Sequence, residues 1–373
     1  MMTSAASPIG KVKANSMRKI IPAIKLAGIV LAILWLFASS AAAAKILVGY
    51  SGISAELSHL WIAKEAGIFK KYGVDVQSVY FSGGNRLMQA LIANDIQFGI
   101  TSGISSARAI VAGADVTIVA GHMNKLTYTL YTAKEITKPE QLRGKAMAIS
   151  GFGTTSHAST MIALKKFGLS PAKDVTLLQI GDQSSRFAAL QANTIQGILI
   201  APPLTLLAKQ RGFNPVLDLS QSGIPWSQEL VLANAALVKT SPELTRDFLK
   251  GFVEGLKLWH TDKAKTVELL ARFMKLDLKA DREALDEAYE FMRRGTEKKP
   301  YPSLEGLQVQ LDMIAETDPR AKNIRPEQLV NLKIIEELDK SGFIDGLYPS
   351  SPRVRSANNT RQSESAKRGA AGL

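Results

Sequence analysis

Short apolar runs alternate with helical patterns from Lys45 to about Leu237. The first half of this stretch predicts strands over 45–50, 74–81 and 96–101, with helices over 55–66 and 86–93 between them. This order of elements is typical of parallel sheets with helices on both faces. Such sheets bind ligands at the carboxyl ends of their strands, where the helix N-termini also point.

The same order of elements returns in a second half, with strands expected over 146–150, 174–180 and 197–200. The two halves also share residues: Ala90–Gln97 and Ala189–Gln196 agree at six of eight positions, at an offset of 99. Both segments end a helix before a strand, where Asn is a common C-terminal residue. Either that shared position or two lobes of similar build explains the match.

Two later stretches, 125–133 and 229–238, have the pattern of strands that cross between lobes and act as a hinge. From Ser241 onward the pattern is helical, and Phe248, Phe252, Leu256 and Trp259 form an apolar stripe that predicts a buried helix face. The expected parts are 1–44 as a signal peptide, 45–130 as the first part of lobe I, 131–230 as lobe II, 231–349 as the return to lobe I with a helical cap, and 350–373 as a disordered basic tail.

The net charge of +13 belongs mainly to the two ends of the chain. Residues 1–44 carry five basic residues and no acidic one, and residues 350–373 carry five basic residues and Glu364. The 305 residues between them carry only +4, which gives no electrostatic footprint for nucleic acid.

The N-terminus has a basic region, the apolar run Leu26–Ala38, and small residues up to Ala44. This pattern predicts an export signal cleaved after Ala44, with Met1 or Met17 as the start. An uncleaved membrane anchor is the alternative, because the apolar and small residues together reach spanning length.

Enzymatic chemistry is not favoured by the residues present. The chain has no cysteine, which excludes thiol nucleophiles and zinc–thiolate sites. The four histidines (His59, His122, His157, His260) have no metal-ligand spacing, so structural or cavity-lining roles are expected. Neither a Gly-x-Ser-x-Gly elbow nor a Walker loop is present. No catalytic residue, metal or cofactor is therefore expected.

Loops rich in glycine and hydroxyl side chains follow the predicted strands. The longest, Gly151–His157, has two glycines and three hydroxyls at the start of a helix, and Ser51–Ser54 and Ser82–Asn85 repeat the arrangement. Glycine lets backbone N–H groups face a ligand, and a helix N-terminus adds partial positive charge. Each loop alone is also compatible with an ordinary turn and N-cap. Together they predict an uncharged site for a polar or anionic group.

At these residues the sequence resembles the substrate-binding proteins of ABC importers for nitrate, sulfonates, taurine and thiamine-pyrimidine precursors. The segments that match are Val48–Ser51, Ala63–Phe69 leading to Val74–Val76, Ala90–Gly99, Leu142–Lys145 and Gly151–His157. The resemblance covers about residues 45–275. It implies an α/β protein with the type II periplasmic-binding fold, in which two lobes close around a small ligand and deliver it to an inner-membrane permease.

In that family the loops after successive strands line the ligand site. The matching positions are Ser51, Ser82, Gly83, Thr101, Ser102, Gly151, Thr154 and Asp182, with Phe81, Asn124, Phe152 and Trp226 as expected walls. Few basic residues lie in these loops, Arg86 being the nearest, and Asp182 is acidic. A sulfonate, carboxylate or polar heterocycle with an organic body is therefore favoured over a fully charged inorganic anion.

The resemblance implies an exported monomer without catalytic activity, located in the periplasm. Two other functions stay open at this point: a membrane-anchored sensory or scaffold subunit with the same fold, and an enzyme of thiamine-precursor metabolism. Yeast-type pyrimidine synthases share the fold but depend on a cysteine-rich segment, which a chain without cysteine cannot supply.

Overall fold

The computed structural model describes residues 44–171 and 173–348. The predictions of a signal peptide, an alternative membrane anchor and a basic tail concern residues outside these ranges, Ala44 excepted. In the part of the chain that is described, no helix is both long and apolar enough to cross a membrane.

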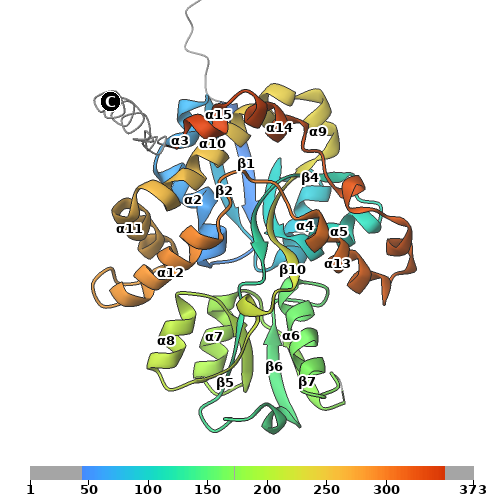
Figure 1. Ribbon diagram of the computed structural model, residues 1–373, viewed down its shortest axis with the longest axis vertical. Coiled ribbons are helices and arrows are strands. Elements are labelled where there is room, and N and C mark those ends of the chain that lie inside the picture. The colour runs from blue at the N-terminus through green and yellow to red at the C-terminus, as the bar shows by residue number, and fades with distance from the viewer. Residues whose placement is uncertain (1–43, 172, 349–373) are drawn as a thin grey trace, which may run out of the picture. The chain divides into compact units, whose positions relative to one another are not determined.

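Two five-stranded sheets form the centres of two lobes (Figure 1). The lobe I sheet has the order β2-β1-β3-β10-β4, with strands β1 (Ala44–Tyr50), β2 (Val74–Tyr80), β3 (Phe98–Ser102), β4 (Val116–Lys125) and β10 (Pro225–Asn234). The lobe II sheet has the order β7-β6-β8-β5-β9, with β5 (Thr129–Thr132), β6 (Lys145–Ile149), β7 (Val175–Gln179), β8 (Gly197–Ile200) and β9 (Asn214–Asp218). The chain crosses between the sheets after β4, within the expected stretch 125–133, and again between β9 and β10, over 219–224. The second crossing thus lies before the expected stretch 229–238, which belongs to β10 and α9 of lobe I because β10 pairs with β3 and β4 along that stretch.

The sheets are mixed rather than purely parallel. Strand β1 is parallel to β3, and β6 is parallel to β7 and β8, as the alternating pattern predicts. Strand β10 runs antiparallel to β3 and β4, and β5 runs antiparallel to β8 and β9. The direction differs because each of these strands enters its sheet from the end at which the neighbouring parallel strands finish.

Helices connect and cover the strands of both lobes. In lobe I they are η1 (Ala55–Leu57), α2 (Ser58–Glu65), α3 (Ile68–Lys71), α4 (Gly84–Ile92) and α5 (Gly103–Val111). In lobe II they are η2 (Pro139–Leu142), α6 (Thr155–Lys166), α7 (Gln183–Gln191), α8 (Leu204–Gln210) and η3 (Leu219–Gln221). After β10 come α9 (Ala235–Thr240), α10 (Pro242–Thr261), α11 (Lys263–Met274), α12 (Arg282–Gly295), α13 (Leu304–Ala315), η4 (Pro319–Asn323), η5 (Pro326–Leu329), α14 (Lys333–Lys340) and α15 (Phe343–Gly346).

The repeated segment has the same structural role in both lobes. Gln97 donates its backbone N–H to the Leu47 carbonyl at 3.0 Å and accepts the Leu47 N–H on its side chain at 2.8 Å. Gln196 makes the same two bonds to Ala146, at 2.8 and 3.3 Å. The preceding helices also end alike, with an asparagine in the left-handed backbone region: Asn94 at φ 62° and Asn193 at φ 54°. Leu47 and Ala146 are themselves 99 residues apart, so two lobes of similar build explain the match.

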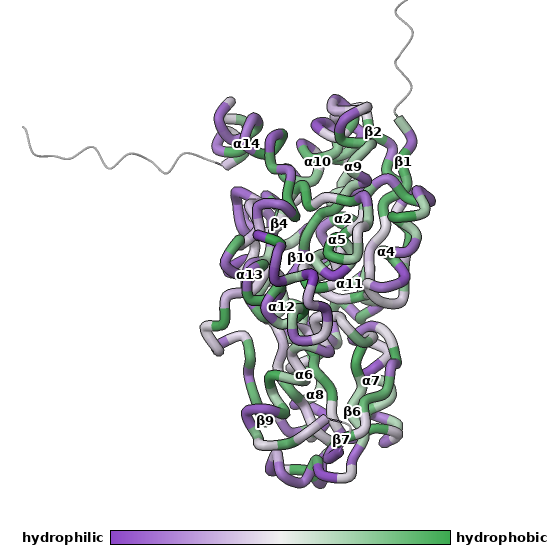
Figure 2. The backbone as a smooth tube through the Cα atoms, turned by 90° about the vertical axis from the view of Figure 1, so that its right-hand side faces the viewer, coloured by the Kyte–Doolittle hydropathy of each residue, from purple (hydrophilic) through white to green (hydrophobic). Residues whose placement is uncertain are grey.

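Helix α10 supplies much of the lobe I core. The predicted stripe of Phe248, Phe252, Leu256 and Trp259 is fully buried, and the Phe248 ring stacks on Phe98 with centroids 4.1 Å apart. Hydrophobic residues predominate along the central strands and hydrophilic residues along the outer turns (Figure 2).

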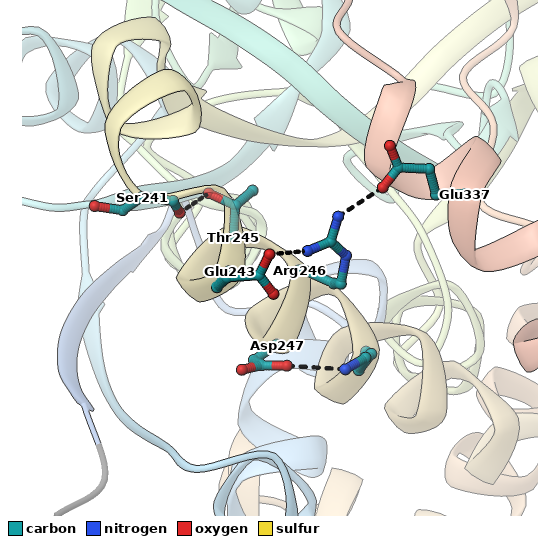
Figure 3. A network of polar contacts seen from close by, with 7 residues as sticks. Ser241, Glu243, Thr245, Arg246, Asp247 and Glu337 are labelled. Atoms are coloured by element: carbon teal, nitrogen blue, oxygen red, sulfur yellow. Dashed lines mark hydrogen bonds and ion pairs between the residues drawn. The ribbon is translucent and has the colours of Figure 1, made fainter.

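The start of α10 is also joined to the C-terminal helices by an ion pair. Arg246 donates to Glu243 on its own helix and, at 2.6 Å, to Glu337 on α14, and Thr245 donates to the Ser241 carbonyl at 3.1 Å (Figure 3). The ion pair between Arg246 and Glu337 joins α14, one of the C-terminal helices, to α10.

Candidate ligand-binding site

Four helices begin at one buried cavity, two from each lobe. The N-cap residues of α4, α5, α6 and α7 are Gly83, Ser102, Thr154 and Asp182, and all four line this inner cavity. A helix N-terminus carries partial positive charge and N–H groups without partners in the helix. The arrangement therefore provides polar donors from four directions.

The N-termini are shaped by their first residues. Asp182 Oδ1 accepts the Ser185 N–H at 2.9 Å, which caps α7. Gly83 has φ 101°, a conformation that favours glycine, at the start of α4. A Cβ on Gly84 would lie 2.7 Å from Thr101 Oγ1, so only glycine leaves room for this hydroxyl beside the helix.

The inner cavity has a volume of about 40 Å³. On this measure one water needs roughly 10–15 Å³, so the space fits a polar group of a few atoms. Its walls are Ser51, Gly52, Ile53, Ser54, Glu56, Leu57, Gly83, Gly84, Thr101, Ser102, Tyr128, Ser150, Thr154, Thr155, Ser156, Asp182, Gln183, Arg186 and Glu229.

A second, outer cavity adjoins the first. It has a volume of about 260 Å³ and shares Gly83, Ser150 and Thr154 with the inner cavity. Ser82, Gly151 and Arg86 also line it. A ligand with its polar end in the inner cavity thus has space for an organic body beside it.

Hydrogen bonds join the two lobes around the cavities. Asp182 Oδ2, from lobe II, accepts the Tyr80 hydroxyl at 2.9 Å and the Ile53 N–H at 3.4 Å from lobe I. Gln183 Nε2 donates to Glu56 Oε2 at 2.9 Å, and Asn85 Nδ2 donates to the Phe152 carbonyl at 3.1 Å. The structure is therefore a closed arrangement of the lobes.

Three carboxylates and one guanidinium line the inner cavity. Glu56 and Glu229 are 1% and 4% exposed, and burial raises the pKa of both carboxyls, that of Glu229 to well above its usual value. The guanidinium of Arg186 is directed to backbone, because Nη1 donates to the Gly181 carbonyl at 2.5 Å and Nη2 to the Leu199 carbonyl at 3.0 Å.

Two histidines lie directly behind Glu56. The rings of His59 and His122 are 4.3 Å apart, and each donates a ring N–H to the Glu56 carbonyl, at 3.0 and 3.2 Å. Burial lowers the pKa of His59 well below its usual value and that of His122 to about 4. Both rings are therefore neutral near pH 7. In the described residues no group of three or more His, Cys, Asp or Glu is placed to hold a metal ion.

The structure brings most of the predicted site residues together. Ser51, Gly83, Thr101, Ser102, Thr154 and Asp182 line the inner cavity, and Ser82 and Gly151 line the outer one. The four predicted walls line neither cavity. Trp226 is buried in the core, Phe81 packs against the core, Phe152 is exposed, and Asn124 is bonded to the Tyr301 carbonyl and the Ser303 N–H.

Glu56, Arg186 and Glu229 were not expected at the site. Each glutamate is the lone Asp, Glu, Lys or Arg in a long stretch of sequence. Glu56 stands alone between Lys45 and Lys64, and Glu229 stands alone between Asp218 and Lys239. A single glutamate within an apolar segment is the sequence signal that could have indicated a functional site, because glutamate is seldom buried without a partner.

Comparison with known proteins places this architecture in a family. The taurine-binding periplasmic protein of Escherichia coli is 29% identical over 240 residues, which are 62% of this chain and 72% of that protein. The alkanesulfonate-binding protein SsuA of Xanthomonas axonopodis, solved with MOPS bound, has a TM-score of 0.64 at 19% identity, over 78% of this chain and 98% of that one. The nitrate-binding protein NrtA of Synechocystis has a TM-score of 0.65 at 17% identity, over 83% and 91%.

These solved structures confirm the expected periplasmic-binding fold, and the relatives are binding proteins rather than enzymes. The family model described as NMT1/THI5-like matches residues 54–264, a range that contains all the residues of both cavities except Ser51, Gly52 and Ile53. The chain belongs to the NMT1/THI5-like family.

Proposed function

We propose that this chain is the periplasmic solute-binding component of an ABC importer, and that its lobes close on a small polar organic solute. One observation carries the proposal: four helix N-caps, two from each lobe, line a single buried cavity. Such a site exists only while the lobes are together, so a solute bound there favours the closed state.

The relatives set the range of solutes to be tested. Their names include taurine, alkanesulfonates and nitrate. The outer cavity of about 260 Å³ beside the inner one favours a solute with an organic body over nitrate. We propose that the polar end lies among the helix N-termini and that the body extends toward Ser82 and Gly151.

The test is binding to purified residues 45–348. A panel of taurine, an alkanesulfonate, nitrate, a carboxylate and a pyrimidine is measured by thermal shift and calorimetry. At one hundred times the dissociation constant, a true ligand should stabilise the protein by roughly 2.7 kcal/mol. Absence of any shift, together with no solute in native mass spectra of protein purified without refolding, would contradict the proposal.

A matched pair of variants locates the binding. Thr155→Val removes a buried hydroxyl that lines the inner cavity and has no hydrogen-bond partner among residues 44–171 and 173–348. Thr176→Val makes the same change at an exposed position of β7. We expect the first variant to weaken binding and the second to leave it unchanged.

We further propose that the protein releases its solute unaltered, acts as a monomer and delivers to an inner-membrane permease. The names of the relatives and the absence of cysteine support a binding role without chemistry. Mass analysis of the solute after prolonged incubation tests the first point, and light scattering of the purified protein tests the second. A changed solute mass would contradict the binding role.

A further inference from the structure

Two glutamates in the inner cavity have carboxylate oxygens without a partner. Glu56 Oε2 accepts from Gln183 Nε2 at 2.9 Å and from Ser54 Oγ at 3.3 Å, but Glu56 Oε1 accepts no hydrogen bond in the described part of the chain. Glu229 Oε2 likewise accepts none there. Buried acceptors normally have partners, and an unpaired buried carboxylate is strongly unfavourable.

The backbone directs both side chains to the same cavity. Glu56 is in the single turn of η1, in the loop that follows β1. Glu229 is on β10, where the pairing with β4 shifts register on both sides of this residue. Such bulges re-aim side chains next to functional sites. Both glutamates line the inner cavity.

The balance of charge around the cavity is negative. The Asp182 carboxylate already accepts hydrogen bonds from Ser185, Tyr80 and Ile53. Of the residues that the structure describes, Arg186 is the one basic residue in the inner lining. The neighbouring His59 and His122 are neutral, as described above. With the carboxyl groups ionised, a simple anion would therefore meet more negative than positive charge.

Two buried hydroxyls give a second, independent indication that a ligand binds here. Thr101 Oγ1 and Thr155 Oγ1 are buried, line the cavity and have no partner in the described residues. A hydroxyl can accept from a cationic N–H group as well as donate to an anion. These oxygens could complete the coordination of a nitrogen group held between the two glutamates.

We infer that Glu56 and Glu229 form a subsite for a positively charged nitrogen group, so that the solute is a zwitterion or a cation. The inference rests on the proposed function and specifies the class of solute. The helix N-termini hold the anionic or polar part of that solute, and the two carboxylates hold its ammonium or amidinium.

The titration of the pair supports this assignment. Burial raises the pKa of Glu229, and the neighbouring charge of Glu56 raises it further; burial also raises the pKa of Glu56, although its hydrogen bonds and Arg186 lower it in part. The other ionisable groups facing the pair are Asp182, Tyr128, His59 and His122. Both shifts favour the protonated carboxyl, so a cationic solute bound between the two glutamates should release a proton from the pair.

The experiment compares solutes that differ only in the charged nitrogen. Taurine is measured against isethionate and β-alanine against 3-hydroxypropionate, by calorimetry in buffers free of sulfonates. We expect each ammonium compound that binds to bind tighter than its hydroxyl partner by on the order of tenfold or more. The calorimetric titration is repeated in two buffers of different ionisation enthalpy. A binding enthalpy that differs between the buffers should show that a proton is released on binding.

Variants assign the effect to the two glutamates. Glu56→Gln and Glu229→Gln should each remove most of the preference for the ammonium compound and the proton release. Glu135→Gln, at an exposed position outside the cavities, is the control and should keep both. Two test variants are used so that the failure of one to fold leaves the other to decide.

The outcomes separate this inference from the proposed function. Equal or tighter binding of the hydroxyl compounds, or an unchanged preference in both glutamine variants, overturns the inference and leaves the binding role intact. A co-purifying solute without a basic nitrogen also overturns the inference and leaves the binding role intact. If no compound binds and no solute co-purifies, the proposed function fails, and the inference fails with it.

Discussion

The Tyr80 hydroxyl donates a hydrogen bond of 2.9 Å to Asp182 Oδ2, and the two residues belong to different lobes. The other oxygen of the same carboxylate caps helix α7 through the Ser185 N–H. One side chain thus fixes the start of a helix in lobe II and joins that helix to lobe I. This double role allows lobe closure and local stability to be tested separately.

Tyr80→Phe should weaken solute binding by about threefold to tenfold, because it removes one hydrogen bond made only when the lobes are together. The melting temperature of the empty protein should change little. Calorimetry with the member of the solute panel that binds measures the effect. Tyr72→Phe is the control, since Tyr72 donates to Glu254 within lobe I. Equal losses in both variants would count against a role in closure.

Substitutions of Asp182 should distinguish its two contacts. Asp182→Asn keeps an oxygen that can cap α7, so unfolding should be little affected while solute affinity falls. Asp182→Ala loses the cap as well and should cost about 1 kcal/mol of stability. Urea denaturation and calorimetry on both variants measure the two quantities. An Asn variant as unstable as the Ala variant would contradict the separation.

Glu229 should make the empty protein less stable as the pH rises. Its pKa in the folded state is raised, so between the unfolded pKa of about 4.3 and this raised value the folded state binds more protons. Stability therefore falls with increasing pH across that window. Glu229→Gln should be more stable than the unchanged protein at pH 8, by about 1–3 kcal/mol, with the difference shrinking toward pH 5. Melting curves of solute-free protein at several pH values provide the measurement, and a difference independent of pH would argue against it.

His122 should have the opposite effect at acid pH. Its pKa is lowered to about 4, so below the unfolded value of about 6.5 the unfolded chain binds more protons and stability falls as the pH decreases. His122→Gln retains a donor for the Glu56 carbonyl but does not titrate. The variant should lose less stability than the unchanged protein between pH 6.5 and pH 4. If the stability of the variant and that of the unchanged protein fall equally between these pH values, His122 does not contribute to the acid sensitivity.

Export should remove the first 44 residues. The predicted cleavage after Ala44 leaves Lys45 as the first residue, one position into strand β1. Intact mass and N-terminal sequencing of protein recovered from the periplasm should both identify Lys45. A mature protein that retains the apolar run Leu26–Ala38 would instead favour the anchored sensory or scaffold subunit.

The predicted site residues that line the inner cavity share one property. Ser51, Gly83, Thr101 and Thr154 lie at or just after the ends of strands, and the glycines and hydroxyls there are a local signal that does not depend on distant parts of the chain. The periodicity of the helices and strands is local as well, which is why the two-lobe fold could be predicted.

The charged part of the cavity could not be located in that way. Glu56 and Glu229 are 173 positions apart, and Glu229 lies where the pairing of β10 with β4 shifts register, which the sequence does not reveal. Trp226 was expected as a wall of the site, but its position on β10 directs it into the core. Which face of a strand a side chain occupies depends on pairing partners far away in the sequence.

The common offset of 99 residues has a consequence for how such a site can change. Position 56 of the first unit corresponds to position 155 of the second, where a threonine stands in place of the glutamate. Both units keep the helix N-terminus, whereas the acid is present in one copy alone. Two lobes of similar build therefore provide a scaffold in which one lobe can differ in charge at the site while both keep the same architecture.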